Sequence, residues 1–253
     1  MTFIDTLALQ EATLLFASVL IAYVGVLVMI GIRRNDAAGV RSTLKSAAVP
    51  VGSIGAIAFL IGLNGEYTWP LPGSYNILFT DVYLLFGATL LVLAISMAAS
   101  LKLQHAGLFA FVAGGVTIFY GWSGYQLGMT KDPLETFLMY GAFGLTAVLA
   151  FPVTVMVDHY LVHPESSVFA APASWASRRA TFSGASRAVQ PVVPGMTSSA
   201  AASESTPAPS SAFRVPVWMN ATLIAFLTFA ALAALSALLY LNTTVPGHLS
   251  YAP

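Results

Sequence analysis

Cysteine is absent from the 253 residues of the chain, and charged residues are scarce. The absence of cysteine excludes disulfides, thiolate metal sites, cysteine-bound iron–sulfur clusters and cysteine nucleophiles. Only 8% of the residues are charged, whereas a soluble domain has about 25%. Ten basic and ten acidic residues cancel to a net charge of zero, so no overall field attracts a polyanion. A soluble enzyme and a nucleic-acid-binding protein are both excluded.

The chain has long apolar runs instead, with 57% hydrophobic residues and a mean hydropathy of +0.80. Six of them are long enough for a helix to cross a bilayer core of roughly 30 Å. They cover residues 9–32, 46–63, 77–100, 105–127, 135–157 and 216–241. Because the runs are continuous rather than alternating, they favour helices over a β-barrel. The predicted fold is an all-α integral membrane protein, a six-helix transmembrane bundle, with Asn64-Gly65 ending the second helix.

The basic residues predict an orientation. Nine of them fall on one side of the predicted bundle and Lys131 alone falls on the other; the nine are Arg33, Arg34, Arg41, Lys45, Lys102, Arg178, Arg179, Arg187 and Arg214. Loops rich in Lys and Arg stay in the cytoplasm. We therefore expect a multi-pass protein of the cell membrane, with both termini outside the cytoplasm.

Residues 163–214 differ in composition from the rest of the chain, being mostly Ala, Ser and Pro with scattered Thr and Val. Such a segment buries too little apolar surface to offset the entropy lost on ordering. It is therefore predicted to be a disordered cytoplasmic linker. The expected organisation is a five-helix membrane domain over 1–162, this linker, and a sixth helix with a short outer tail over 215–253.

Most side chains that could carry chemistry fall near the predicted outer ends of the helices. The candidate pocket residues there are Glu11, Glu66, Trp69, Tyr75, Asn76, Asp81, Tyr125 and Gln126. Ionisable residues at membrane depth are rare and usually face the protein interior or water. One outward-open pocket of carboxylates and tyrosines that binds a proton, a small cation or a solute is therefore a hypothesis. The alternative is structural: the aromatic residues anchor the headgroup layer, and Glu11 complements the N-terminus of its helix, which we favour for Glu11.

Metal and redox sites have weaker support. His248 is the one histidine expected outside, and it could join Glu66 and Asp81 in a mixed nitrogen and oxygen metal site. No pair of histidines is placed within the membrane to hold a haem, no motif surrounds a serine nucleophile, and no other cofactor is indicated.

Small residues predict close helix contacts. Gly124 and Gly128 stand four residues apart in the fourth helix, and the sixth helix has a face of alanines, namely Ala230, Ala233, Ala234 and Ala237. Faces of this kind let helices approach closely in a membrane. The partner of the sixth helix is either this bundle or another membrane protein.

The segment from Thr68 to Ile77, TWPLPGSYNI, is followed by Phe79 and Asp81. It resembles the hallmark of an uncharacterised membrane-protein family of archaea and some bacteria, a domain of unknown function. Gly247-His-Leu249 resembles the family's ending. The resemblance covers roughly residues 1–160 and 215–253, implies a membrane fold and draws attention to residues 66–81, but it implies no activity. The long linker is a departure, since members of the family join their last helices briefly.

Three functional hypotheses follow. The first and favoured one is a non-catalytic subunit or assembly partner of a larger membrane complex, for example a respiratory one. The second is a protein that binds a proton, a small cation or a solute in the acidic pocket. The third, disfavoured by the lack of a catalytic motif, is a membrane enzyme with a metal held by Glu66, Asp81 and His248.

Overall fold

The computed structural model describes residues 6–162 and 217–249, with side chains for 7–162 and 218–242. The predicted linker lies outside this part of the chain. The described residues form helices and no strand, and the elements are α1 (Thr6–Arg33), α2 (Ala37–Thr68), α3 (Ser74–Asn76), the π-helix η1 (Ile77–Asp81), α4 (Val82–Ala98), α5 (Gln104–Gln126), α6 (Pro133–Val162) and α8 (Val217–Leu249). Six helices, counting α3, η1 and α4 as one, are long and apolar enough to cross a membrane. The prediction of an all-α, six-helix membrane fold is confirmed.

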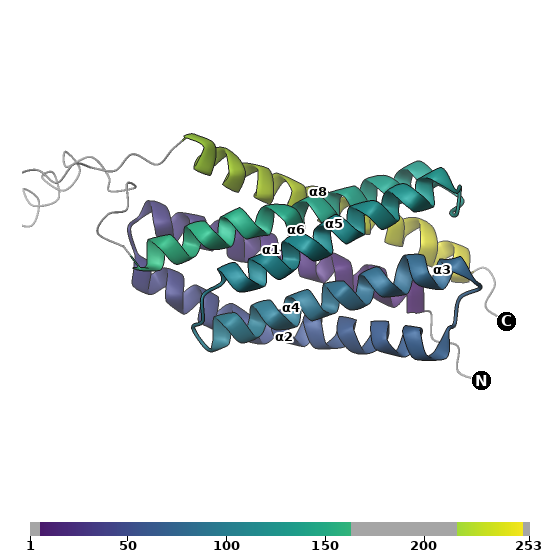
Figure 1. Cartoon of the computed structure of the whole chain (residues 1–253), viewed down its shortest axis with the longest axis horizontal. Helices are drawn as coiled ribbons and strands as arrows, with labels where there is room; N and C mark the ends of the chain where they lie inside the picture. The colour runs from purple at the N-terminus through teal and green to yellow at the C-terminus, as the bar shows by residue number, and fades with distance from the viewer. Residues whose placement is uncertain (1–5, 163–216, 250–253) are drawn as a thin grey trace, which may run out of the picture.

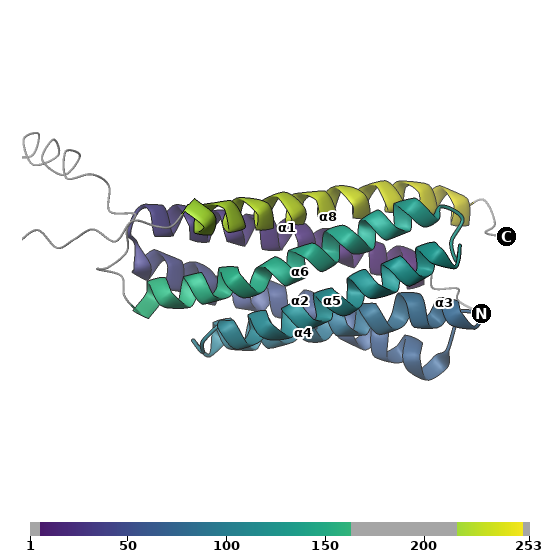
Figure 2. The same ribbon diagram turned by 45° about the horizontal axis from the view of Figure 1, so that its top comes forward.

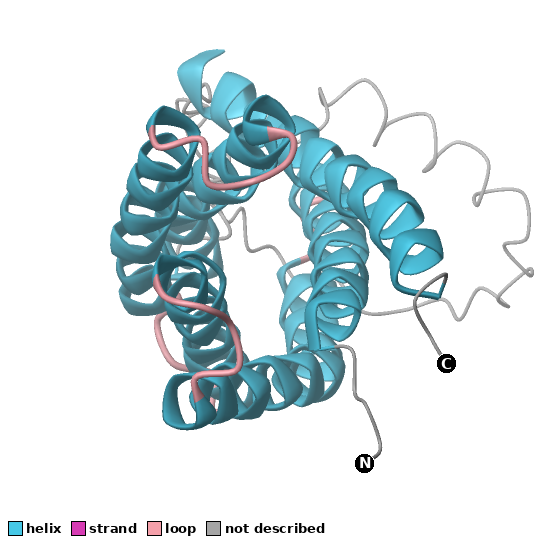
Figure 3. Ribbon diagram, turned by 90° about the vertical axis from the view of Figure 1, so that its right-hand side faces the viewer, coloured by secondary structure: helices cyan, strands magenta, loops and turns pink. Residues whose placement is uncertain are grey.

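The six long helices form a closed ring. Each packs mainly on two neighbours, in the order α1, α2, α4, α5, α6, α8 and back to α1. The helices run along the long axis of the molecule (Figure 1), and α8 lies along α1 and α6 (Figure 2). The view along this axis shows the ring directly (Figure 3). The start of α1 and the end of α8 lie at the same end of the ring (Figure 1).

The two ends of the ring differ in chemistry. The turns from α1 to α2 and from α4 to α5 lie at one end, with Arg33, Arg34, Arg41, Lys45 and Lys102; we name it the cationic end. The loops from α2 to α3 and from α5 to α6 lie at the other, with Trp69, Tyr75, Trp122 and Tyr125; we name it the aromatic end. Among the described Lys and Arg residues, only Lys131 lies at the aromatic end.

The second helix begins nine residues earlier than predicted, at Ala37 instead of residue 46. Asn35 adopts a left-handed conformation (φ 55°) that ends α1, and Asp36 then accepts a hydrogen bond from Gly39 N (2.7 Å) as the N-cap of α2. The first three turns of α2 carry Arg41 and Lys45. A search for apolar runs misses such turns because they are polar, although they are fully helical.

The second helix also continues past Asn64-Gly65, where the sequence predicted its end. Gly65 is buried against Thr80, so it allows close packing rather than stopping the helix. The helix ends at Thr68, and Trp69 closes it in a left-handed conformation (φ 47°), donating its N–H to Gly65 O (3.0 Å). Asp81 was expected one turn into an α-helix but is the last residue of the π-helix η1.

The alanine face of α8 is used as predicted, whereas of Gly124 and Gly128 only Gly124 lies in a close contact, against Leu78 of η1. Ala230, Ala233 and Ala237 are almost fully buried where α8 packs on α1 and α6, so this face is used inside the ring. Gly128 lies beyond the end of α5 with φ 59°, and it helps to close that helix. It therefore cannot form a helix–helix contact together with Gly124.

Candidate functional site

A cavity of about 90 Å³ lies inside the ring, in the half toward the aromatic end. Every long helix except α2 contributes to its wall, as does η1. Most lining side chains are apolar; the polar ones are Gln10, Glu11, Tyr83, Thr89, Thr117, Tyr140 and Tyr240. We name it the Glu11 cavity. An apolar wall with a few convergent polar groups is typical of a small-molecule site.

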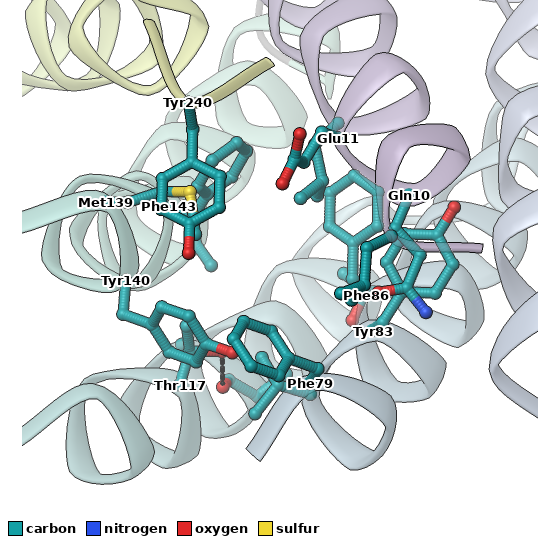
Figure 4. Close-up of a pocket in the computed structure, with 17 residues that line it drawn as sticks. Gln10, Glu11, Phe79, Tyr83, Phe86, Thr117, Met139, Tyr140, Phe143 and Tyr240 are labelled. Atoms are coloured by element: carbon teal, nitrogen blue, oxygen red, sulfur yellow. Dashed lines mark hydrogen bonds between the residues drawn. The ribbon is translucent and has the colours of Figure 1, made fainter. Parts of the chain in front are cut away.

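Glu11 is the only acidic residue among those lining this cavity, and it is 6% exposed. Its carboxylate points into the cavity from α1, and Tyr240 of α8 lies on the facing side (Figure 4). Leu7, Gln10, Glu11 and Leu14 line the same wall because residues three or four apart share a helix face. Glu11 is thus an interior residue, and the simple helix N-terminus role favoured from the sequence does not account for its burial.

The tyrosines of the cavity are fixed by the surrounding helices. The hydroxyl of Tyr140 donates to Leu78 O in the π-helix (2.7 Å), which ties α6 to η1. The hydroxyl of Tyr83 is buried beside the Thr13 side chain of α1, and the Tyr83 side chain lines the cavity.

A second cavity of about 140 Å³ follows toward the cationic end. It shares Phe86, Thr89, Phe143 and Ala147 with the Glu11 cavity. The rings of Phe86 and Phe143 meet edge to face there, with centroids 6.3 Å apart. The wall beyond them is almost wholly apolar and rich in alanine, so we name this space the apolar cavity. The two cavities are neighbours within the ring, and the one toward the aromatic end has more polar groups in its wall than the other.

Glu66 and Asp81 lie together at a separate place. The hydroxyl of Tyr120 donates to Asp81 Oδ2 (2.8 Å), and the Glu66 carboxyl lies within hydrogen-bonding reach of Asp81. Glu66 Oε1 is buried and has no hydrogen-bond partner among the described residues. Neither carboxylate lines the Glu11 cavity. The structure therefore brings Glu66 and Asp81 together, as the pocket hypothesis required, but leaves Glu11 out of their group.

None of the other predicted pocket residues lines the Glu11 cavity. Asn76 is fully buried and donates to Gly65 O (3.2 Å), so it connects α3 to α2 next to Glu66. Trp69 and Tyr75 are exposed at the aromatic end. Tyr125 packs with Trp122 and Phe137 on the outside of α5 and α6, and Gln126 is exposed beside it. The side chain of His248 lies outside the described residues, so the metal site proposed for it stays a prediction.

Sequence reasoning missed Gln10, Tyr83, Tyr140 and Tyr240 as cavity residues. Tyr240 stands three residues after Ala237 and seven after Ala233, on the buried face of α8, so helical periodicity could have placed it inside. For Tyr83 and Tyr140 we find no such signal, since their helices are apolar all round.

The comparisons with known proteins give one match. The sequence model of a family described as "Protein of unknown function (DUF981)" matches residues 1–173. No curated protein and no solved structure matches the chain. The matched residues include α1 to α6 and stop before α8.

Proposed function

Because the chain belongs to the DUF981 family, whose function is unknown, we propose its function from its own structure. We propose that this multi-pass membrane protein binds an elongated amphiphilic molecule inside its ring of helices. The polar head of the molecule lies in the Glu11 cavity, and its apolar tail extends past Phe86 and Phe143 into the apolar cavity.

The burial of Glu11 is the observation that carries this proposal. A carboxylate that is 6% exposed inside a membrane protein loses most of its hydration, which costs several kcal/mol unless other groups compensate. Buried ionisable residues in membrane proteins usually mark a substrate or ion pathway for this reason. Glu11 also faces a cavity rather than a packed core, so a bound molecule can reach it.

The wall of the cavities defines the chemistry of the ligand. The Glu11 carboxylate accepts hydrogen bonds, and the Gln10 amide and the Tyr83 hydroxyl donate and accept them. A head group with N–H donors, such as a primary amine, fits this set. The apolar cavity offers almost no polar partner, so a polar tail would lose its hydration there without replacement.

A matched pair of variants tests the head-group assignment. The purified full chain in nanodiscs is melted with an alkylamine and with the alcohol of equal chain length. We expect the amine to raise the melting temperature more than the alcohol does, because only a bound ligand stabilises the folded state. Glu11→Gln should abolish this difference. Glu135→Gln, which neutralises a carboxylate in the first turn of α6 outside the cavity, should retain it. An unchanged amine preference in Glu11→Gln would refute the proposal.

A second pair of variants tests whether the apolar cavity holds the apolar tail of the ligand. Ala150 lines the apolar cavity, whereas Ala231 is exposed on α8. Ala150→Leu should shorten the longest alkyl chain that stabilises the protein, and Ala231→Leu should not. Equal chain-length limits in both variants would show that the apolar cavity is not used.

Glu66 and Asp81 support a second candidate function, the binding of a proton or a small cation. Two carboxylates in contact repel each other unless a positive charge lies between them, and the Tyr120 hydroxyl already holds one oxygen of Asp81. We expect infrared spectroscopy to detect a protonated carboxyl that disappears in Glu66→Gln and shifts in Tyr120→Phe. If both variants keep the wild-type spectrum, the pair holds no shared proton.

The remaining functional hypotheses have less support. Small-residue helix faces were the contact sites expected for a membrane-protein partner, and the one on α8 packs within the chain itself. The concentration of described Lys and Arg residues at the cationic end supports the proposal that this end faces the cytoplasm.

A further inference from the structure

A third cavity, of about 190 Å³, opens at the cationic end between α2, the α4–α5 turn and the end of α6. Five of its eleven lining residues are polar or charged, and most of the wall surface is apolar. Arg41 and Lys102 provide positive charge, and Leu44, Met97 and Leu161 provide apolar surface. We name it the Arg41 cavity. It is separate from the two cavities inside the ring and shares no residue with them.

The guanidinium of Arg41 is held in place at this cavity. Its Nη2 donates to Leu161 O at the end of α6 (2.7 Å), a contact between residues 120 positions apart in the sequence. This single bond leaves other N–H groups of the fork free to donate. Within the described part of the chain, neither Arg41 nor Lys102 forms an ion pair with a carboxylate. The two cations are therefore available to an anion.

Asp158 is the one carboxylate in the wall, and its oxygens are already in use. Oδ1 accepts from Leu103 N (3.0 Å) and Oδ2 accepts from Gln104 N (2.8 Å), so the side chain caps the start of α5. Its carboxylate accepts hydrogen bonds from two backbone N–H groups and forms no ion pair with Arg41 or Lys102 among the described residues. The cavity keeps an excess of positive charge, with two cations and one carboxylate.

The turn between α4 and α5 adds a hydroxyl to this wall. Ser100 lines the cavity in a left-handed conformation, with φ 54°. Glycine is the usual residue at this position of a helix end, since other residues are strained there. The rim next to it is apolar and exposed, with Leu101 at 58% and Val162 at 62% exposure. Positive charge, a hydroxyl and an apolar rim thus meet at this one cavity.

We propose that the Arg41 cavity binds the phosphate group of an anionic phospholipid. Phosphate accepts hydrogen bonds from the arginine fork and attracts the lysine ammonium. Basic pockets between transmembrane helices bind lipid head groups in this manner. The exposed apolar rim favours a lipid over a free phosphate, because Leu101 and Val162 can contact the acyl chains of a bound lipid and would offer nothing to an inorganic ion.

Native mass spectrometry of the full chain in a neutral detergent tests this site. The probes are a phosphatidylglycerol, a phosphatidylcholine with the same acyl chains, and inorganic phosphate. We expect one phosphatidylglycerol to bind several-fold more tightly than phosphatidylcholine. A cation near the membrane surface contributes about a fivefold gain in affinity for an anionic lipid. Lys102→Gln should therefore lower the affinity for phosphatidylglycerol about fivefold, and a variant that adds Arg41→Gln should lower it further.

The control is Lys45→Gln, which removes one positive charge from the same end but outside the cavity wall. It should leave the phosphatidylglycerol affinity nearly unchanged. An equal loss in Lys45→Gln and Lys102→Gln would overturn the proposal in favour of general attraction to the cationic end. Equal binding of the two lipids, or competition by inorganic phosphate at equal concentration, would overturn it as well. Lys102 is exposed on a turn, so its variant should fold, and an unchanged melting temperature without lipid checks this.

Discussion

A close approach of α4 to α2 in the ring can be tested by adding a single methyl group. Gly87 of α4 lies against the backbone of α2: a Cβ at this position would meet Phe59 Cα at 2.6 Å and Ala58 C at 2.8 Å. Carbon atoms in favourable contact are about 3.5–4.0 Å apart. Since the obstructing atoms belong to the backbone, no side-chain rotation relieves the clash. The substitution Gly87→Ala must push α4 and α2 apart by roughly 1 Å.

The expected loss can be set against a matched control. Forcing an extra methyl group into a packed contact typically costs 1–3 kcal/mol, while replacing glycine by alanine within a helix gains up to about 1 kcal/mol. Gly115 of α5 is exposed, and a Cβ there would meet nothing within 4 Å. Gly115→Ala should therefore gain stability from the higher helix propensity of alanine, with no packing cost. We expect the free energy of unfolding of Gly87→Ala to lie about 2 kcal/mol below that of Gly115→Ala.

Unfolding both variants with SDS in mixed micelles, followed by circular dichroism, measures this difference. The comparison cancels the effect of helix propensity because both positions are in the middle of a helix. Equal stability of the two variants would refute the interlocked packing of α2 and α4. It would also argue against the order of helices given for the ring, since this order depends on the pairing of α2 with α4.

Three further substitutions probe individual hydrogen bonds, each through the melting temperature in detergent. Tyr140→Phe leaves the carbonyl of Leu78 without its donor and should cost about 1–3 kcal/mol; an unchanged melt would show that water replaces the hydroxyl. Asp158→Ala exposes two N–H groups at the start of α5 and should cost about 2 kcal/mol, whereas Asp158→Asn, which keeps an acceptor, should cost less. Asp36→Ala removes the N-cap of α2 and should cost about 1 kcal/mol, a loss that Asp36→Ser should largely avoid.

The number and order of the membrane helices were predictable because a single physical requirement fixes them. Each span must be apolar over about 20 residues, and this signal is local in the sequence. The ends of the helices were less predictable because a helix can extend beyond the bilayer as a polar segment, as α2 does from Ala37. Glycines within a span are ambiguous for a different reason, because glycine lowers helix propensity but lets helices pack closely. Judged by helix propensity alone, Gly55 and Gly62 should destabilise α2. In the fold, both lie against backbone atoms of α4.

The interior cavities could not be predicted because they depend on which faces of distant helices meet. Glu11 and Ser18 are seven residues apart, which places them on one face of α1, and this face points inward. The sequence offered no means to tell that Tyr83 and Tyr140 lie across from it. Proximity along the chain suggested instead that Glu11, Glu66 and Asp81 share a pocket, because all three lie near the same end. Glu66 and Asp81 meet beside Tyr120 instead, and neither of them lines the Glu11 cavity.

The helix that closes the ring lies outside the segment that identifies the family. The family match ends at residue 173, whereas α8 supplies Tyr240 to the Glu11 cavity and Phe226, Ala230 and Ala233 to the apolar cavity. Helix α8 is also the element that joins α1 to α6, so both cavities would open toward lipid on that side without it. Selectivity in an apolar site comes from its few polar groups, and Tyr240 is the one that α8 contributes. A ligand found for another member of the family should therefore be expected in this chain only where that member presents a comparable hydroxyl from its own closing helix.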